Sequence, residues 1–293
     1  MCYHARVVSR VYTAHVTVRH DEVDRFGHVH PGVYLRYLAH AAVEASAAGG
    51  FDRDWYAAAG GMWIIRRSTL DVIDPLRAEE RVAIATWVED FRRVRSHRRY
   101  TIDAADGRPR LAARTDWVYV DGATGRPRRV PPEFEAACGL EPGQGSERAA
   151  WEAPTAPAVP AVTTHRVRAC ELDAIGHVNN AVYLDLLAQA VLDAFEDAGW
   201  PLGELVGAGS VPRLAGADVE YLDGALYGDR LELATWFAPA EGTLDAHHHI
   251  VRAGGDRPLV RATTRWRWMP LAADAPANVP PGLLAALAPV LAA

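Results

Sequence analysis

The sequence contains no lysine, so all 31 of its basic residues are arginine. Together with 37 acidic residues they leave a formal net charge of −6, which excludes the strongly basic balance of a typical nucleic-acid-binding protein. Cysteine is scarce: Cys2, Cys138 and Cys170 form no C-x-x-C pair, and an odd number is a poor basis for a disulfide framework. We therefore expect reduced thiols and a cytoplasmic protein.

Long apolar runs are missing as well. No uninterrupted apolar stretch reaches the roughly 20 residues that a membrane-spanning helix needs. The N-terminal segment also lacks the continuous apolar core of a signal peptide. The chain has 293 residues, 49% hydrophobic and 23% charged, which are the proportions of a globular protein with one large or two ordinary domains. We expect neither a membrane nor a nucleic acid as partner.

One phrase occurs twice in this sequence. DRFGHVHPGVYL begins at Asp24, and DAIGHVNNAVYL begins at Asp173, which is 149 residues later. At the same offset, ATWV at 85–88 matches ATWF at 234–237. We interpret the offset as running without a gap for about a hundred residues, and a register of that length predicts a duplicated domain.

Each copy predicts the same series of elements. Alternating apolar residues at 14–20 and 164–169 predict a first strand, and helical periodicity predicts a helix over 33–50 and 181–200. Strands that follow one another without intervening helices predict an antiparallel sheet. Four such segments follow each helix, at 63–73, 81–90, 97–104 and 111–121, and at 212–222, 230–238, 246–253 and 259–269.

The predicted fold class is therefore α+β, with two domains in tandem at 1–130 and 161–293. The proline-rich stretch 131–160 is predicted to be the linker between them, with a short helix over 132–138. A second short apolar helix is predicted in the C-terminal PPGLLAALAPVLAA.

The repeated phrase, D-x-x-G-H-V-N-N-x-x-Y-L before a helix and four or five strands, resembles the hotdog-fold thioesterases. It is similar to the 4-hydroxybenzoyl-CoA thioesterase-like enzymes and to the acyl-ACP thioesterases. The resemblance implies a double hotdog, in which each sheet wraps around a central helix and the copies form an intramolecular pseudo-dimer. It also implies an enzyme that hydrolyses an acyl-CoA or acyl-carrier-protein thioester to a carboxylic acid and a thiol. No cofactor is implied, and a homodimer of the whole chain is compatible with the resemblance.

Thioester hydrolysis needs a base or nucleophile and donors for the developing oxyanion. The resemblance assigns the first role to the loop carboxylates of Asp24 and Asp173. The N–H groups at the start of the following helix would supply the second. Because Gly27 and Gly176 lack a side chain, a thioester could approach the backbone closely there. An aspartate in such a loop also has a purely structural interpretation, as the cap of a turn.

The second copy has the fuller motif. There His177 and Asn179 are assigned to orienting water or the carbonyl group, and Asn180 to substrate binding or to the N-cap of the helix. In the acyl-ACP thioesterases an asparagine lies two residues before the histidine, where this chain has Ile175. That particular catalytic set is therefore incomplete here.

The first copy retains His28 but has His30 and Pro31 in place of the two asparagines. It offers instead Glu44, one helical turn after His40, and several hotdog thioesterases use a helix glutamate. A solvated carboxylate is the plainer interpretation. Whether one copy or both are active stays open, with the second copy favoured because its motif is complete.

Further substrate contacts are assigned to Tyr34 and Tyr183, the tyrosines of the repeated phrase. In FRRVRSHRRY at 91–100, arginine side chains suit the phosphates of CoA or of a phosphopantetheine arm. The three assigned to this role are Arg92, Arg93 and Arg95. The alternative is a charged edge strand that discourages aggregation.

Other site chemistries are less well supported. On a strand only His247 and His249 of the HHH run would share a face, and no further residue has convincing ligand spacing, so we predict no metal site. Two other functions remain open: a hotdog hydratase or dehydratase, and a non-catalytic acyl-binding protein.

Overall fold

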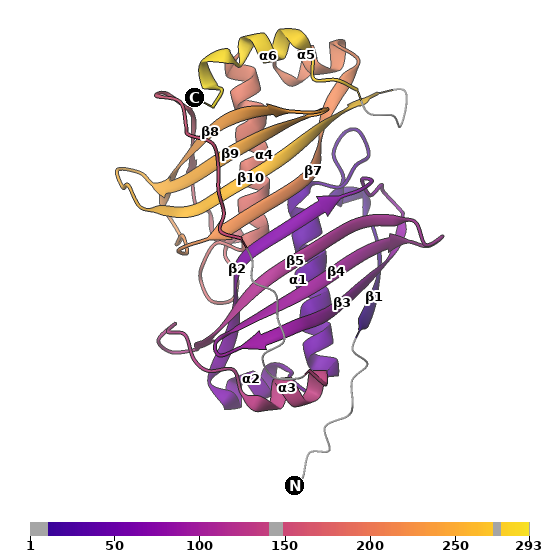
Figure 1. The fold of residues 1–293 in the computed structure, drawn as a ribbon, viewed down its shortest axis with the longest axis vertical. Helices are drawn as coiled ribbons and strands as arrows, with labels where there is room; N and C mark the ends of the chain where they lie inside the picture. The colour runs from indigo at the N-terminus through magenta and orange to yellow at the C-terminus, as the bar shows by residue number, and fades with distance from the viewer. Residues whose placement is uncertain (1–10, 141–148, 272–276, 293) are drawn as a thin grey trace. The chain divides into compact units, whose positions relative to one another are not determined.

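The computed structural model describes residues 11–140, 149–271 and 277–292 (Figure 1). Its contacts divide the chain into two compact units. The first unit comprises the chain up to Ala149, except Asp24–Phe26 and His30–Gly32, which cluster with the second unit from Ala150 onward. Cys2 and part of the predicted linker, 141–148, lie outside the described residues.

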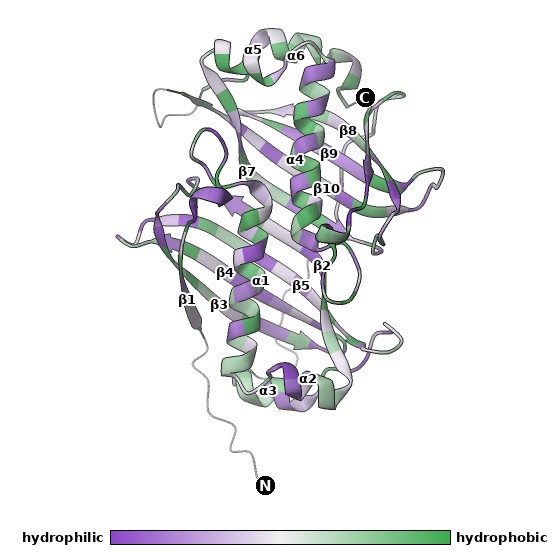
Figure 2. Cartoon of the chain, turned by 180° about the vertical axis from the view of Figure 1, so that it is seen from behind, coloured by the Kyte–Doolittle hydropathy of each residue, from purple (hydrophilic) through white to green (hydrophobic). Residues whose placement is uncertain are grey.

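The first unit is one antiparallel sheet with a long helix, α1, lying along one of its faces (Figure 2). The strand order is β1-β3-β4-β5-β2. Its elements are β1 (Tyr12–Thr17), the 3₁₀ turn η1 (His20–Glu22), α1 (Pro31–Ala48), α2 (Arg53–Ala59), β2 (Gly61–Val72), β3 (Arg81–Arg92), β4 (Arg95–Ala104), β5 (Pro109–Asp121) and α3 (Pro132–Cys138).

The second unit repeats this design with strand order β7-β10-β9-β8-β6 and the long helix α4. The double hotdog fold is thereby confirmed, with each strand within a few residues of its predicted range. The elements are β6 (Ala161–Arg166), η2 (Ala169–Glu171), α4 (Asn180–Asp197), α5 (Leu202–Gly207), β7 (Ser210–Tyr221), β8 (Arg230–Ala240), β9 (Thr243–Arg252), β10 (Pro258–Pro270), α6 (Pro281–Ala286) and η3 (Ala288–Val290).

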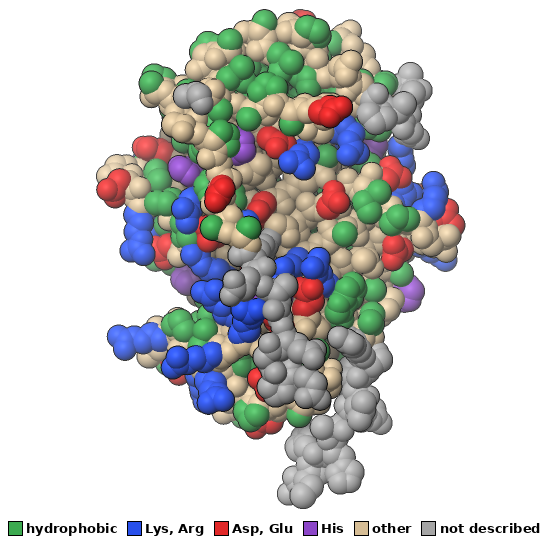
Figure 3. Space-filling view, in the orientation of Figure 1, with side chains coloured by type: hydrophobic (Ala, Val, Ile, Leu, Met, Phe, Trp, Pro, Cys, Tyr) green, Lys and Arg blue, Asp and Glu red, His purple; other side chains and the backbone are tan. Residues whose placement is uncertain are grey.

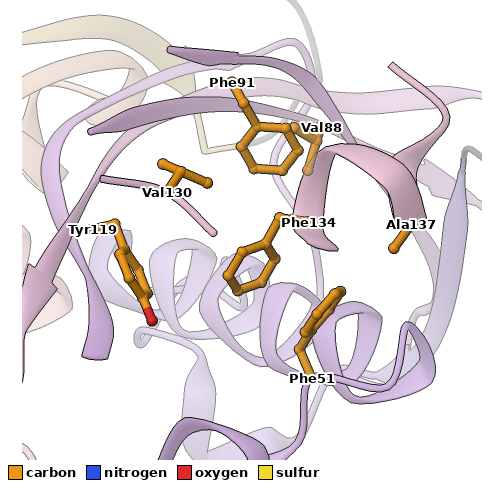
Figure 4. Close-up of a cluster of buried hydrophobic side chains, with 7 residues drawn as sticks. All are labelled: Phe51, Val88, Phe91, Tyr119, Val130, Phe134 and Ala137. Atoms are coloured by element: carbon orange, nitrogen blue, oxygen red, sulfur yellow. The ribbon is translucent and has the colours of Figure 1, made fainter. Parts of the chain in front are cut away.

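The start of the predicted linker belongs to the first unit. The predicted helix at 132–138 is α3, and its Phe134 is buried in an aromatic-rich cluster of the first unit (Figure 4). The ring centroids of Phe134 and Phe51 are 4.2 Å apart. The buried members of the cluster are Phe51, Val88, Phe91, Tyr119, Val130, Phe134 and Ala137.

The two long helices are buried to different extents. In α4 the buried side chains extend along the whole helix to Phe195, which stacks on Phe237 at a ring-centroid distance of 5.6 Å. In α1 the buried residues end at Ala42, and the last turns are half-exposed or exposed. None of the helices in the described ranges combines the length and the apolarity that crossing a membrane requires.

The prediction of an ungapped offset between the copies is wrong at one strand. The hydroxyl of Tyr100 lies 3.1 Å from that of Thr115, and in the second unit Nε2 of His248 lies 2.9 Å from the hydroxyl of Thr264. Thr264 follows Thr115 by 149 residues, whereas His248 follows Tyr100 by 148. The reason is a bulge in β3 between Val88 and Asp90, which β8 lacks.

His248 is a buried neutral histidine. It has no solvent-exposed surface, and its two ring nitrogens lie 3.0 Å from the hydroxyl of Thr235 and 2.9 Å from that of Thr264. Burial, followed by the neighbouring His247 and His249, lowers its pKa from 6.5 to about 3. Between these values the unfolded chain binds a proton that the folded chain does not bind.

This difference predicts a pH-dependent stability. As the pH falls from 6.5 toward 3, His248 destabilises the fold, with a slope of up to about 1.4 kcal/mol per pH unit. Urea denaturation at pH 7, 6 and 5 should show a shallower decline for His248→Gln than for the wild type. His15→Gln, at an exposed position on β1, is the control and should keep the wild-type slope. Equal slopes for all three proteins would contradict the prediction.

Candidate functional site

The second motif loop is a tight turn organised by Asp173. Its Oδ1 accepts hydrogen bonds from the backbone N–H groups of Ile175 (3.0 Å) and His177 (3.3 Å). Gly176 closes the turn with φ of 82°, a left-handed conformation that glycine adopts without strain. Within the described residues, the second oxygen of Asp173 has no hydrogen-bond partner. Asp173 therefore holds the turn with one oxygen and leaves the other available to water.

Asp24 in the first motif loop is held differently. Its Oδ1 accepts from the backbone N–H of Phe26 at 2.8 Å, and its Oδ2 lies 2.5 Å from Nη1 of Arg213. Arg213 is itself buried, and its guanidinium lies 4.9 Å from the ring centroid of Phe26. Both oxygens of Asp24 are thus engaged. Gly27, with φ of 77°, has the same conformation as its counterpart Gly176.

A short turn that the sequence analysis missed precedes each loop. Glu22 and Glu171 occupy equivalent positions in η1 and η2, and each accepts the backbone N–H of an arginine three residues earlier at 2.8 Å. Burial alone would raise the pKa of Glu171, but hydrogen bonds from Arg168 and His165 lower it overall. The repeated R-x-x-E pattern, in RHDE and RACE, is the signal that could have revealed this turn.

The N-cap of α4 is Asn179, and not Asn180 as the sequence analysis allowed. The Asn179 side chain accepts the N–H of Ala181 at 2.9 Å, while Asn180 is the first helical residue. The first copy has His30 at the capping position, and there Asp185 accepts the N–H of Gly32 at 2.8 Å. A Cβ at Gly32 would lie 2.3 Å from the Asp185 carboxylate, so this contact requires glycine.

The two motif histidines have backbone roles in their loops. The backbone of His28 bridges to Arg77, and that of His177 bonds to Asp173. The His177 side chain is exposed and lies over Gly224, where a Cβ would come within 2.8 Å of the imidazole. Gly224 therefore provides the space that His177 occupies.

The two motif tyrosines are buried structural groups. The hydroxyl of Tyr34 accepts the backbone N–H of Leu76 at 3.1 Å, and that of Tyr183 accepts the N–H of Ala225 at 3.0 Å. Both side chains are almost fully buried. Each tyrosine thereby ties its helix to the loop that follows the next strand of its own unit.

Glu44 forms a partly exposed pair with His40, at 3.3 Å between Oε1 and Nε2. In the second copy Gln189 and Asp193 form the equivalent pair on α4, at 2.6 Å. This geometry matches the solvated interpretation of Glu44, because two different sequences produce the same surface contact one helical turn apart.

The arginines near the β3–β4 turn do not converge on one point. Arg92 pairs with Asp90 at 3.4 Å, Arg93 and Arg95 are exposed, and Arg99 pairs with Glu89 at 2.8 Å. Basic side chains are numerous on the lower part of the face seen in Figure 3. Exposed arginines near a hairpin end fit phosphate binding and a charged sheet edge equally well.

A cavity of about 360 Å³ lies within the first unit. It lies beside the second half of α1, residues 42–49, which is roughly 15–25 Å along the helix axis from the first turn. Its wall is mostly apolar, with side chains from α1, α2, β2, β3, β5 and α3. The aromatic lining residues are Phe51, Tyr56, Trp63, Phe91, Trp117 and Phe134.

Residue size explains why the equivalent space in the second unit is filled. Ser46 on α1 and Val88 on β3 line the cavity, and their counterparts in the repeat are Phe195 and Phe237. Those two rings are fully buried and stacked on each other. Two small residues in the first copy thus leave the volume that two phenyl rings occupy in the second.

The polar groups that line the cavity are neutral, apart from the exposed Asp52 and Arg53 and the half-buried Arg98 on β4. The hydroxyl of Ser46 donates to the carbonyl oxygen of Phe51 and lies 2.9 Å from the hydroxyl of Tyr56. Burial raises the pKa of Tyr56 to about 12 and raises that of the Cys138 thiol. Neither group is therefore ionised at neutral pH, which argues against Cys138 as a nucleophile. Among the described residues, no cluster of histidine, cysteine, aspartate or glutamate is arranged to hold a metal ion.

The capping geometry makes a prediction about stability. Asn179→Ala should lower the free energy of unfolding by about 1 kcal/mol, because it removes the acceptor for the N–H of Ala181. Asn180→Ala is the matched control and should have little effect, since only its backbone carbonyl has a described bond, with Tyr221. Urea denaturation measures both. A larger loss in Asn180→Ala would contradict this assignment of the cap.

Comparisons with known proteins agree with the duplicated architecture. The sequence profile of the thioesterase-like superfamily matches residues 18–138 and again residues 167–287, at the same offset of 149 residues. No curated protein sequence matches the chain significantly.

Solved structures share the fold across both units. A protein designated an oleoyl thioesterase, from Lactobacillus plantarum, is 22% identical, with a TM-score of 0.78 over 89% of this chain and 97% of its own. The 12:0-ACP thioesterase from Umbellularia californica is 17% identical, with a TM-score of 0.72 over 88% of this chain and 94% of its own. An acyl-ACP thioesterase from Bacteroides thetaiotaomicron is 20% identical, with a TM-score of 0.65 over 88% of this chain and 98% of its own.

At these identities the structural similarity establishes the fold. The two profile matches cover most of the sequence, one for each unit. The chain therefore belongs to the thioesterase-like superfamily.

Proposed function

We propose that this protein hydrolyses an acyl thioester of CoA or of an acyl carrier protein to a free carboxylic acid and a thiol. The observation that carries the proposal is the cavity of about 360 Å³ under α1, in a member of the thioesterase-like superfamily. Ligand sites are typically cavities of this kind, apolar with a few polar groups. The structures named as acyl-ACP thioesterases have the same two-unit fold, which is compatible with a carrier-bound substrate.

The cavity is suited to the part of the acyl group that is remote from the thioester. Its volume is that of about 12 water molecules at about 30 Å³ each, which is room for about as many non-hydrogen atoms. Its aromatic side chains would bury the hydrocarbon part of such a group. Acyl groups of medium size are therefore the expected substrates.

Asp173 is the better of the two loop carboxylates for the chemistry. Its free oxygen could accept a proton from a water molecule as that water attacks the carbonyl carbon. The same proton could then pass to the departing sulfur when the C–S bond breaks. Asp24 is less suited to this role, because Arg213 occupies the oxygen that would receive the proton.

The other candidate residues of the site have supporting roles in this proposal. Asn179 caps α4, and its amide N–H₂ group remains available to a carbonyl or a water. The exposed imidazole of His177 is close to the same turn. N–H groups at the start of α4 and the positive end of its dipole would stabilise the oxyanion. Exposed Arg93 and Arg95 would contact phosphates of CoA or of a phosphopantetheine arm. The proposed hydrolysis does not require the chain to form a homodimer.

Substitution of the two aspartates tests the site. Asp173→Asn keeps an oxygen for the N–H groups of Ile175 and His177 but cannot accept the proton, so kcat should fall by at least about 100-fold. Asp24→Asn should have a smaller effect, with its loss arising from the weakened contact with Arg213. Thiol release is measured over a panel of acyl-CoA and acyl-carrier-protein thioesters.

The same assay separates the competing functions. A hydratase or dehydratase would change enoyl absorbance without releasing thiol, and a binding protein would do neither. Full activity in both Asp173→Asn and Asp24→Asn would contradict the assignment of the site. Activity on carrier-bound but not CoA-bound substrates would identify the carrier protein as the partner.

Filling the cavity tests its role as the acyl site. Ser46→Phe introduces the residue that the second copy has at this position and should lower kcat/KM for medium-chain thioesters about tenfold or more, with a smaller effect on acetyl-CoA. Ser46→Ala removes the hydrogen bonds to Phe51 and Tyr56 without filling the space and is the control. If Ser46→Phe folds normally and retains activity on every chain length, the acyl group binds elsewhere.

A further inference from the structure

Three charged residues line the cavity: Asp52, Arg53 and Arg98. Asp52 and Arg53 are exposed at the start of α2, where Asp52 accepts the N–H of Trp55, whereas Arg98 lies on the sheet.

Arg98 on β4 lines the apolar cavity of the first unit together with Trp63 and Trp117. Its side chain is half-buried. The adjacent Arg99 points to the opposite face of the strand, where it pairs with Glu89. Arg98 therefore places a permanent positive charge in a mostly apolar wall.

The charge of Arg98 is poorly matched by the protein. A guanidinium carries five N–H donors. Within the described residues, Arg98 makes a single hydrogen bond, from Nη1 to the hydroxyl of Thr86 at 3.2 Å, and no carboxylate lies within ion-pair distance. Four donors and the full positive charge remain for water or for a ligand.

The second unit shows how this strand is built when no cation is needed. Ala246 occupies the position of Arg98. Arg98 pairs with Thr115 in the neighbouring strand, and Ala246 pairs with Thr264, which is the equivalent threonine of the second unit. Ala246 is fully buried, and the nearby Thr235, His248 and Thr264 satisfy one another without any charge. The fold therefore does not require an arginine at this position.

A purely hydrocarbon acyl group would be a poor occupant of this cavity. It would displace part of the water around the half-buried Arg98 without replacing the hydrogen bonds of that water, which is unfavourable. A carboxylate would instead accept two parallel N–H donors from the guanidinium and neutralise the charge. The effect is largest where the surroundings are apolar, as they are here.

We propose that Arg98 selects acyl groups that carry a second, anionic oxygen group, such as a carboxylate, at a position remote from the thioester. This inference rests on the proposed function for the identity of the substrate as a thioester, but the binding of the acidic group does not depend on catalysis. Arg98 then acts as a specificity-determining residue, with the aromatic wall holding the hydrocarbon part of the same acyl group.

Two measurements test the proposal, and the first does not require turnover. Tryptophan fluorescence, with Trp63 and Trp117 in the cavity wall, reports the binding of suberic acid monomethyl ester and of methyl octanoate, which lacks the carboxylate. The acidic ester should bind at least about tenfold more tightly to the wild type. Arg98→Met should abolish this preference, and Arg98→Lys should restore part of it.

The second measurement compares the initial rates of thiol release from suberoyl-CoA and octanoyl-CoA. The two thioesters differ at the end remote from the sulfur, where only suberoyl-CoA carries a free carboxylate. The ratio of the two kcat/KM values should favour suberoyl-CoA and should fall about tenfold or more in Arg98→Met. Arg99→Met makes the same change of charge on the opposite face of the strand and is the matched control. It should keep both the binding preference for the acidic ester and the kinetic preference for suberoyl-CoA.

The outcomes separate the two proposals. Equal binding of the acidic and neutral esters to the wild type, or a preference that survives in a folded Arg98→Met, would overturn the role of Arg98. Retention of Arg98-dependent binding with no thiol release from any thioester would support the role of Arg98 and overturn the proposed hydrolysis.

Discussion

The burial of one long helix against one face of an antiparallel sheet is the contact on which each unit of this protein depends. The strands alternate their side chains between two faces, so one face of each sheet needs an apolar cover. α4 provides that cover along its entire length, ending in Phe195. α1 provides it only to Ala42, and the space beyond is closed partly by α2 and α3. The hollow in the first unit is thus a local departure from a packing scheme that the second unit completes.

Duplication explains how such a departure can persist. The second unit retains a fully packed core, in which the rings of Phe195, Phe237 and Trp268 contact one another. The first unit can then give up packing at Ser46 and Val88, because the aromatic cluster around Phe134 remains buried beside the cavity. The polar groups follow the same division: a neutral His248 satisfied by threonines in one unit, and the cationic Arg98 in the other. One copy has a filled core, and the other retains a cavity beside its aromatic cluster.

The motif loops show that a structural and a chemical interpretation of one residue need not exclude each other. Asp173 caps its own turn with one oxygen, which is the structural role expected for an aspartate before a positive-φ glycine. Its second oxygen has no hydrogen-bond partner among the described residues and is the one to which we assign the chemistry. Asp24, at the same place in the repeated phrase, has its second oxygen bound by Arg213. Two loops with nearly the same sequence therefore differ in the hydrogen bonds of their aspartates because of a residue almost two hundred positions away.

The sequence by itself determined the duplication, the order of the elements and the identity of the central helices, because these follow from local periodicity and from a repeat that is visible in the residues. It also predicted α3 and the short C-terminal helix. Only the tertiary structure decided the shift of one residue in β9, the partner of Asp24, the cap at Asn179 and the cavity that contains Arg98. The shift in β9, the partner of Asp24 and the cavity depend on contacts between residues far apart in the chain, where a bulge, a ring or a single guanidinium changes what its neighbours can reach. The cap is a local contact between Asn179 and Ala181, and the backbone geometry decides which of the two adjacent asparagines makes it.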